Sequence, residues 1–314
     1  MPSVALSLDF NPANPELLLV SYINGTISLF RVPTAYLTGS SAAGEDLNED
    51  GTRNIPEAEL LQTWKMHEKF AIAAQFTLDG FGFISGAHDN KVAIFKTQMQ
   101  STTGDEKALP KYECVKEIVF NGQVEALTRL HPKNGSATDT PEGKDDADVL
   151  DLPPRTFVLS VRGENNLLFL DLDTADVVGQ MNMNANGDDH VSFTALSLAC
   201  SPRGHLLLVA TDTHRVIMFH IPTRSIVRNF YGATNGDMSS PRVCWAPRGD
   251  MTRILCTAQD NSIHVWDANS QRHLGVSHEN HSKRLRDFTC SATGDGLYSV
   301  SFDQTLIEWQ IVEE

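Results

Sequence analysis

The segment Arg284–Trp309, RLRDFTCSATGDGLYSVSFDQTLIEW, decides the fold. It reads as three short strands separated by two turns. One repeat earlier, the segment Ser239–Asp267, SSPRVCWAPRGDMTRILCTAQDNSIHVWD, has the same order of strands and turns. In both segments an Asp stands six residues before a Trp, at Asp260 and Asp303. A unit of roughly 40–45 residues with this order is typical of a propeller blade, a four-stranded sheet that buries its faces only by stacking on neighbours.

The same order can be followed outward along the whole chain. A bulky or apolar residue recurs just before the turn after each first strand, at Phe10, Phe76, Leu130, Cys200, Trp245 and Cys290. Each is followed by two more strands rich in Val, Ile, Leu and Phe, and in five cases by a fourth. The chain therefore predicts an all-β fold, a β-propeller of about six four-stranded blades and about 23 strands, with residues 1–314 forming a single propeller domain. No segment has a convincing helical period.

The last blade is expected to be one strand short, since the chain begins inside the first strand of repeat one and ends after the third strand of repeat six. Three interpretations remain open. The ring closes with one three-stranded blade, a partner strand fills the open edge, or the chain is part of a longer polypeptide with a seventh blade upstream.

Two long acidic insertions interrupt the repeats. Residues 33–59 join the third and fourth predicted strands of blade one, and residues 133–154 join the first and second of blade three. We expect both to be disordered, solvated loops on the bottom face of the propeller. The alternative is a docking strip for a basic partner, in which DVLDLPP (Asp148–Pro154) is the part most able to order on binding.

Composition restricts the function further. The net charge of −15 argues against direct nucleic-acid binding, where neutralisation of phosphates supplies most of the affinity. No run of eighteen apolar residues and no signal peptide are present, so no membrane association is expected. The five cysteines are odd in number and lack a CxxC pair, which predicts reduced thiols in an intracellular protein, cytoplasmic or nuclear. No cofactor or metal is expected: there is no P-loop, no GxGxxG, and Asp188, Asp189 and His190 are contiguous in a loop.

The segment His281–Trp309 resembles the WD-repeat family. The family pattern has a His before the first strand, Ser or Thr in the second, Asp in the next turn and Trp in the third. These are His281, Ser299 or Ser301, Asp303 and Trp309 in repeat six, and His67, Ser85 and Asp89 with Phe95 for the Trp in repeat two. Repeat five keeps Asp260, Trp266 and Asp267 and has no matching His, and the other three repeats are degenerate.

The resemblance implies that these polar residues hold the blades together. In the family the His, Ser, Asp and Trp form one hydrogen-bond network, and closed buried networks rigidify a fold. The network residues are then His67, Asp89, Asp260, Trp266, His281, Asp303 and Trp309. The competing hypothesis, a catalytic triad around His281 and Asp303, lacks a nucleophile elbow or other nucleophile context, and we expect no enzymatic activity.

The resemblance also implies where a partner binds. Residues near the start of the first strand and just before the turn Asp lie on the top face near the central channel in this family. Exposed aromatics beside Arg are typical of protein-binding hot spots. The candidate protein-binding residues are Phe70, Ile72, His88, Arg242, Gln259, Lys283, Arg284, Arg286 and Phe302. The loop Asn184–His190 adds acidic residues to the same face.

The sequence therefore predicts a non-catalytic scaffold that binds other proteins through the top face and channel mouth, as peptides or domains of a multisubunit complex. The alternatives are a sensing or regulatory propeller within a larger multidomain protein, or an assembly factor in a ribonucleoprotein or other multisubunit complex. A cullin-ligase adaptor is disfavoured because the family's WDxR signature is absent, Trp266-Asp267 being followed by Ala268 and Asn269.

Overall fold

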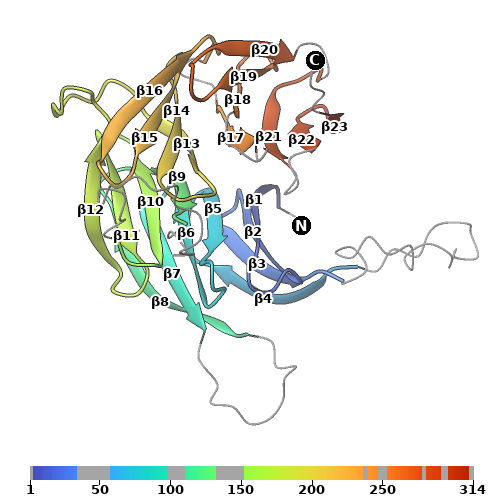
Figure 1. The fold of residues 1–314 in the computed structure, drawn as a ribbon. Helices are drawn as coiled ribbons and strands as arrows, with labels where there is room; N and C mark the ends of the chain where they lie inside the picture. Colours follow the sequence, from blue (N-terminus) through green and yellow to red (C-terminus); the bar gives the residue numbers. More distant parts are fainter. Residues whose placement is uncertain are drawn as a thin grey trace, which may run out of the picture. The chain divides into compact units, whose positions relative to one another are not determined.

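The computed structural model describes residues 3–33, 57–97, 110–131, 152–235, 240–246, 253–277, 281–290 and 296–310. These ranges contain strands and turns, with the strands of each sheet adjacent in chain order (Figure 1). The fold class is that of an all-β β-propeller with six blades, five of four strands and the last of three. None of the described ranges forms a helix with the length and apolarity needed to cross a membrane.

The strand bounds follow the predicted repeats. Blade one is β1 (Ala5–Phe10), β2 (Leu17–Tyr22), β3 (Thr26–Arg31) and β4 (Glu59–Lys65). Blade two is β5 (Ala71–Phe76), β6 (Gly82–Ala87), β7 (Lys91–Thr97) and β8 (Tyr112–Val119). Blade three is β9 (Val124–Arg129), β10 (Thr156–Val161), β11 (Asn166–Asp171) and β12 (Asp176–Asn182).

The second half of the chain continues the pattern. Blade four is β13 (Ala195–Cys200), β14 (Leu206–Thr211), β15 (Arg215–His220) and β16 (Ser225–Tyr231). Blade five is β17 (Val243–Ala246), β18 (Arg253–Thr257), β19 (Ile263–Asp267) and β20 (His273–Ser277). Blade six is β21 (Leu285–Cys290), β22 (Gly296–Ser301) and β23 (Leu306–Gln310). The six predicted repeats are confirmed, and the last blade has three strands within the described ranges, as predicted.

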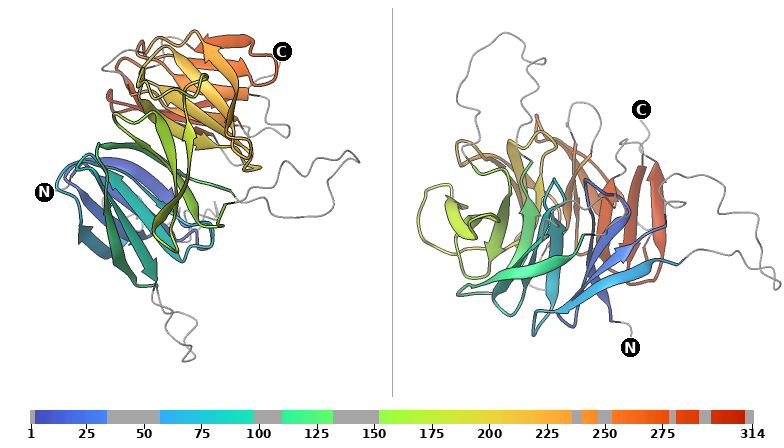
Figure 2. Two further views of the ribbon diagram at one scale, coloured as in Figure 1. Left: turned by 90° about the vertical axis from the view of Figure 1, so that its left-hand side faces the viewer. Right: turned by 90° about the horizontal axis from the view of Figure 1, so that it is seen from below.

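The chain divides into two compact units. Unit one holds residues 1–124 and 171–176, and unit two holds residues 125–170 and 177–314. Blades one and two thus belong to unit one, and blades four, five and six to unit two (Figure 2). Blade three is divided, because the turn between β11 and β12 groups with unit one.

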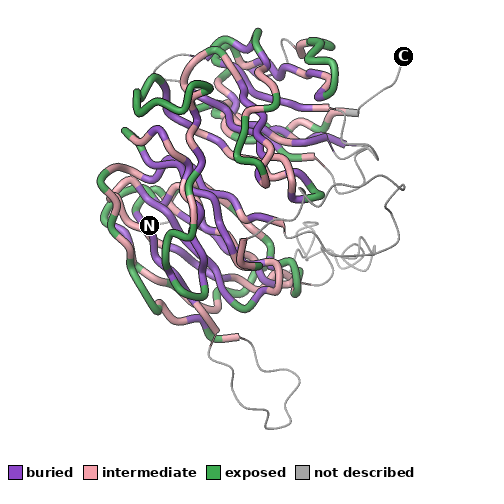
Figure 3. The backbone as a smooth tube through the Cα atoms, turned by 60° about the vertical axis from the view of Figure 1, so that its left-hand side comes forward, coloured by how far each residue is buried: buried purple, intermediate pink, exposed green. Residues whose placement is uncertain are grey.

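Burial explains why each sheet has this strand order. The middle strands are the most buried: every residue of β6 and β10 is buried, as are five of the six in β14 (Figure 3). The fourth strands β8, β12 and β16 are mostly exposed or partly buried, and each has a single buried residue. In blade six, β23 is the outermost described strand, and its Leu306 is 65% exposed.

In four blades, the same side-chain to backbone hydrogen bond stabilises the tight turn between the second and third strands. The side chains of Asn24, Asp89, Asp260 and Asp303 each accept a hydrogen bond from the backbone N–H two residues on, at 3.0–3.1 Å. The residue after each has positive φ, namely Gly25, Asn90, Asn261 and Gln304. Asn and Asp form such turns because their short side chains replace a backbone acceptor. At Gly25 a β-carbon would also lie 2.2 Å from the His67 carbonyl oxygen, so a side chain is excluded there.

A β-bulge recurs in the first strand of four blades. The register shifts between Ala5 and Ser7, between Ala71 and Ala73, between Ala195 and Ser197, and between Leu285 and Asp287. The residues that lack a cross-strand partner are Leu6, Ile72, Leu196 and Arg286. A bulge bends the strand and re-aims the side chain at the extra residue.

The first acidic insertion ends earlier than the sequence indicated, since Glu59 is the first residue of β4 and its side chain pairs with that of Arg31 on β3 at 3.2 Å. The prediction of disorder falls on residues outside the described ranges, as does that for most of 133–154. The strand positions that flank both insertions are the predicted ones.

Candidate functional site

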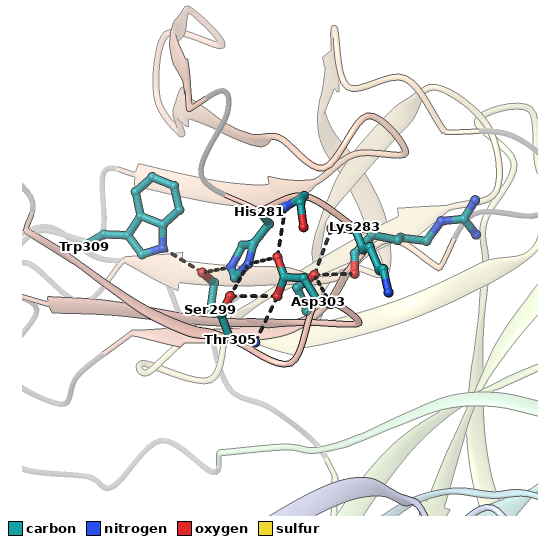
Figure 4. Close-up of polar contacts among 9 residues, drawn as sticks. His281, Lys283, Ser299, Asp303, Thr305 and Trp309 are labelled. Atoms are coloured by element: carbon teal, nitrogen blue, oxygen red, sulfur yellow. Dashed lines mark hydrogen bonds and ion pairs between the residues drawn. The ribbon is translucent and has the colours of Figure 1, made fainter.

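The polar cluster of blade six is centred on the buried His281 (Figure 4). Its Nδ1 lies 3.0 Å from Asp303 Oδ2 and its Nε2 lies 2.8 Å from Ser299 Oγ. Trp309 Nε1 donates to the same Ser299 Oγ at 2.7 Å. The cluster therefore joins the loop before β21 to the second strand, the next turn and the third strand of the blade.

One assignment of protons satisfies every member of this cluster. A hydroxyl has one proton, so Ser299 accepts from Trp309 and donates to His281 Nε2. His281 then carries its proton on Nδ1 and donates it to Asp303. Burial would raise the pKa of Asp303, but hydrogen bonds from Thr305, His281 and the Ser282 backbone outweigh it and hold the pKa well below its ordinary value.

Blade two repeats the arrangement in unit one. His67 Nδ1 lies 3.2 Å from both carboxylate oxygens of Asp89, and Nε2 lies 2.8 Å from Ser85 Oγ. Phe95 occupies the place of the Trp and stacks on Phe83 instead. Burial lowers the pKa of His67 despite the neighbouring Asp89 carboxylate. The imidazole is thus held neutral by desolvation.

The connectivity Ser299–His281–Asp303 is that of a Ser-His-Asp triad, and the burial of its hydroxyl decides against that role. Ser299 and Ser85 are 0% exposed, so neither Oγ can reach a substrate carbon. Ser299 Oγ is also fully used by its two partners. These atoms tie a blade together, and their chemistry is structural.

Blade five departs from this pattern. Cys256 stands where blade six has Ser299, because Ile254 pairs with Trp266 just as Leu297 pairs with Trp309. Trp266 Nε1 donates instead to the Tyr231 carbonyl oxygen at 3.0 Å. The indole N–H of Trp266 therefore does not bond to a histidine, and the Asp260 side chain accepts hydrogen bonds from Ser262 in its own turn.

We expect acid to weaken blade two through His67. The imidazole of His67 has an ordinary pKa in the unfolded chain and a lowered pKa in the folded chain, so the unfolded chain binds a proton there at higher pH. The stability contributed by neutral His67 is therefore complete above the unfolded pKa and is lost as pH falls below it. The urea concentration at the midpoint of unfolding should decrease as the pH is lowered from 7 to 5. His67→Gln keeps the hydrogen-bond geometry without the titration and should show a shallower slope. Equal slopes for wild type and His67→Gln would contradict the role of this residue.

The predicted binding residues of blade two lie at the end of the sheet that carries the β6–β7 turn. The His88 backbone N–H donates to the Phe70 carbonyl at 3.0 Å, and the rings of Phe70 and His88 lie 5.7 Å apart. Phe70 is 45% exposed. Ile72 is the bulge residue of β5 and is partly buried. Phe70 and His88 therefore lie on two loops joined by a backbone hydrogen bond, and Ile72 lies at the start of the adjoining strand β5.

Blade six has the same loop pair with different side chains. The Phe302 backbone N–H donates to the Arg284 carbonyl at 3.2 Å, and Ser301 Oγ donates to the carbonyls of Lys283 and Arg284. Phe302 is 57% exposed, and Lys283 is exposed. An exposed aromatic ring therefore stands beside a basic loop, both held by backbone hydrogen bonds.

The remaining two arginines come together at the bulge of β21. Burial and the neighbouring Arg242 guanidinium lower the pKa of Arg286, with Asp287 as the opposing carboxylate. Arg242 Nε lies 3.9 Å from Asp287 Oδ1, so blades five and six contribute to one cluster. Asp287 is not among the predicted site residues, because a contact between two blades cannot be read from one repeat alone. We call Arg242, Lys283, Arg284, Arg286 and Phe302 the blade-six basic surface.

Gln259 and the acidic loop also belong to unit two. Gln259 is exposed and its backbone N–H donates to the Thr234 carbonyl. In the loop Asn184–His190, the Asp188 carbonyl oxygen accepts from the side-chain amides of Asn165, Asn182 and Asn184. That loop is thus ordered by amide side chains.

Within the described ranges, His, Cys, Asp and Glu side chains do not gather in groups of three or more that could hold a metal ion. In comparisons with known proteins, no family model matches the chain and no curated protein matches it.

Proposed function

We propose that this protein is a non-catalytic, intracellular interaction platform of the WD-repeat kind, cytoplasmic or nuclear, and that the blade-six basic surface captures an acidic segment of another protein. The observation that carries the proposal is the loop pair of Phe302 and Arg284. An aromatic side chain that is 57% exposed stands next to arginine and lysine on backbone fixed by hydrogen bonds.

Preorganisation supports this assignment. Binding is stronger where the receptor loses little conformational freedom, and the Arg284 loop is already tied by the Phe302 N–H and the Ser301 hydroxyl. Aromatic and arginine side chains are the residues that most often dominate the energy of protein interfaces.

Charge supports an acidic partner. The chain carries a net charge of −15, yet Lys283 and Arg284 lie beside Phe302 and its turn, and Arg242 and Arg286 lie near Asp287. Arg242 and Arg286 repel each other, and a carboxylate from a partner would relieve that repulsion. The partner segment we infer has Asp or Glu next to an apolar side chain that packs on Phe302.

The resemblance of the His281 and His67 clusters to the WD-repeat pattern supports the platform role. Both clusters join the loop before the first strand, the second strand and the following turn in one polar network. Propellers held in this way present their loops on rigid strands, which is how binding residues are generally positioned.

A peptide library displayed against the full-length chain tests the proposal. We expect enriched peptides to combine acidic and apolar residues, and Phe302→Ala or Arg284→Glu to weaken the best peptide by about tenfold or more. Phe81→Ala is the matched control, since Phe81 is 49% exposed at the opposite end of a blade-two strand. Peptides of no common charge, or equal binding by Phe302→Ala and wild type, would overturn it.

A further inference from the structure

Two cysteines from different blades meet in unit two. Cys244 lies on β17 of blade five and Cys290 is the last residue of β21 in blade six. Their Sγ atoms are 3.6 Å apart although the residues are 46 positions apart in sequence. Both residues are partly exposed and both are free thiols.

Their proximity follows from how first strands pack. Trp245 and Cys290 are equivalent in register, since Trp245 pairs with Ile254 and Cys290 pairs with Leu297. Trp245 Nε1 reaches back to Ala199, also 46 positions earlier. The contact between Cys290 and Cys244 is therefore the same inter-blade contact one blade further on, where both partners happen to be cysteine.

The structure assigns a function to this pair: we propose that Cys244 and Cys290 form a reversible disulfide between blades five and six when the protein meets a hydroperoxide. A disulfide bond is about 2.05 Å long. The sulfurs therefore close by about 1.5 Å from their contact distance.

The chemistry balances with the peroxide as oxidant. The Cys290 thiolate attacks one peroxide oxygen, the O–O bond breaks, and the leaving hydroxide takes a proton to become water. Cys290 is now a sulfenic acid. The Cys244 sulfur attacks the Cys290 sulfur, the S–O bond breaks, and the departing hydroxide takes the Cys244 proton. Two thiols and one hydrogen peroxide give one disulfide and two waters.

The order of the two steps depends on which thiol donates the hydrogen bond between the two sulfurs. With Cys290 as the acceptor, the pKa of Cys290 is lowered and that of Cys244 is raised. Thiolates are the reactive form, so Cys290 reacts first and Cys244 resolves. Cys256 provides the contrast, because burial alone raises its pKa to about 12.

The disulfide would act on the part of the fold with the fewest strands. Blade six has three described strands, and its outer strand β23 exposes Leu306. A covalent link from β17 to β21 would constrain a loop that spans 46 positions in the unfolded chain. It would hold the blade that carries Lys283, Arg284 and Phe302.

Peptide mapping tests the proposal without reference to any partner. The full-length reduced chain is treated with hydrogen peroxide, quenched, alkylated in denaturant and digested with trypsin. Cys244, Cys256 and Cys290 then lie on three separate peptides, which are Val243–Arg248, Ile254–Arg272 and Asp287–Glu314 respectively. We expect the cross-link between the first and third peptides to form about tenfold faster than any link involving Cys114, Cys200 or Cys256.

Variants separate this result from misfolding. Cys256→Ser should leave the cross-link unchanged, and Cys244→Ser should abolish it while Cys290 accumulates as a sulfenic acid that dimedone traps. In the Cys290→Ser variant, Cys244 should not accumulate as a sulfenic acid. Oxidised wild type should melt several degrees higher than reduced wild type. The proposal is overturned if the cross-link forms no faster in folded protein than in urea, or if dimedone labels Cys244 in preference to Cys290.

Discussion

Phe83→Ala should lower the free energy of unfolding of unit one by about 3–5 kcal/mol. Phe83 is 0% exposed in β6 and stacks on Phe95, with ring centroids 4.2 Å apart and an interplanar angle of 12°. Trp64, Phe76 and Tyr112 surround it at centroid distances of 5.3–5.8 Å. Truncation removes the centre of this aromatic cluster and leaves a cavity that its rigid neighbours cannot fill.

Phe81→Ala is the matched control, because it deletes the same side chain two residues away, where the ring is 49% exposed. Its effect should stay within about 0.5 kcal/mol. Urea unfolding followed by tryptophan fluorescence compares the two. Equal destabilisation by both substitutions would contradict a core centred on Phe83.

Ser299→Ala should cost about 2–4 kcal/mol, because one hydroxyl satisfies the buried His281 and the partly buried Trp309, and each unsatisfied group costs about 1–3 kcal/mol. The affected atoms are His281 Nε2 and Trp309 Nε1. Ser282→Ala nearby, at an exposed side chain, should be nearly neutral. Denaturant unfolding gives both values.

Comparison with blade two sharpens this prediction. Ser85 bonds to His67 alone, since Phe95 has no donor, so Ser85→Ala orphans one group where Ser299→Ala orphans two. In a double-mutant cycle, Ser299→Ala and Trp309→Phe should be strongly non-additive. Additive effects would mean that the serine and the tryptophan act separately.

Much of the fold could be predicted from the sequence because its signals are local. An Asp or Asn in the turn before a positive-φ residue is set by side chain and backbone within four positions, and it marks the hairpins of Asn24, Asp89, Asp260 and Asp303. The number of strands and the short last blade can be predicted from such local turn signals.

Features that depend on pairing across strands or blades could not be predicted in this way. The bulge at Arg286 depends on how β21 aligns with β22, and it cannot be predicted from the residue types of β21. The tryptophan of blade five shows the same limit. Trp266 looks like Trp309 in sequence, but with Cys256 in place of serine its N–H turns to the Tyr231 carbonyl.

The surroundings of the candidate binding residues could not be predicted from the sequence. The sequence places Phe302 beside the turn and Arg284 before the strand, and the structure joins them through one backbone hydrogen bond. Asp287 and the Cys244–Cys290 contact arise between blades, where a repeat's own residues give no indication of which neighbour they will meet.

The recurring first-strand bulge has a consequence for how such a chain can diversify. Leu6, Ile72, Leu196 and Arg286 occupy one structural position in four blades, and all four are partly buried. Because the bulge residue has no cross-strand partner, its side chain is exempt from the alternation that fixes its neighbours inside or outside. Three blades carry an aliphatic residue there and one carries a guanidinium, so this position accepts either chemistry while the sheet around it stays the same. A library randomised at these four positions should therefore yield folded variants with altered surfaces more often than one randomised at the adjacent paired residues.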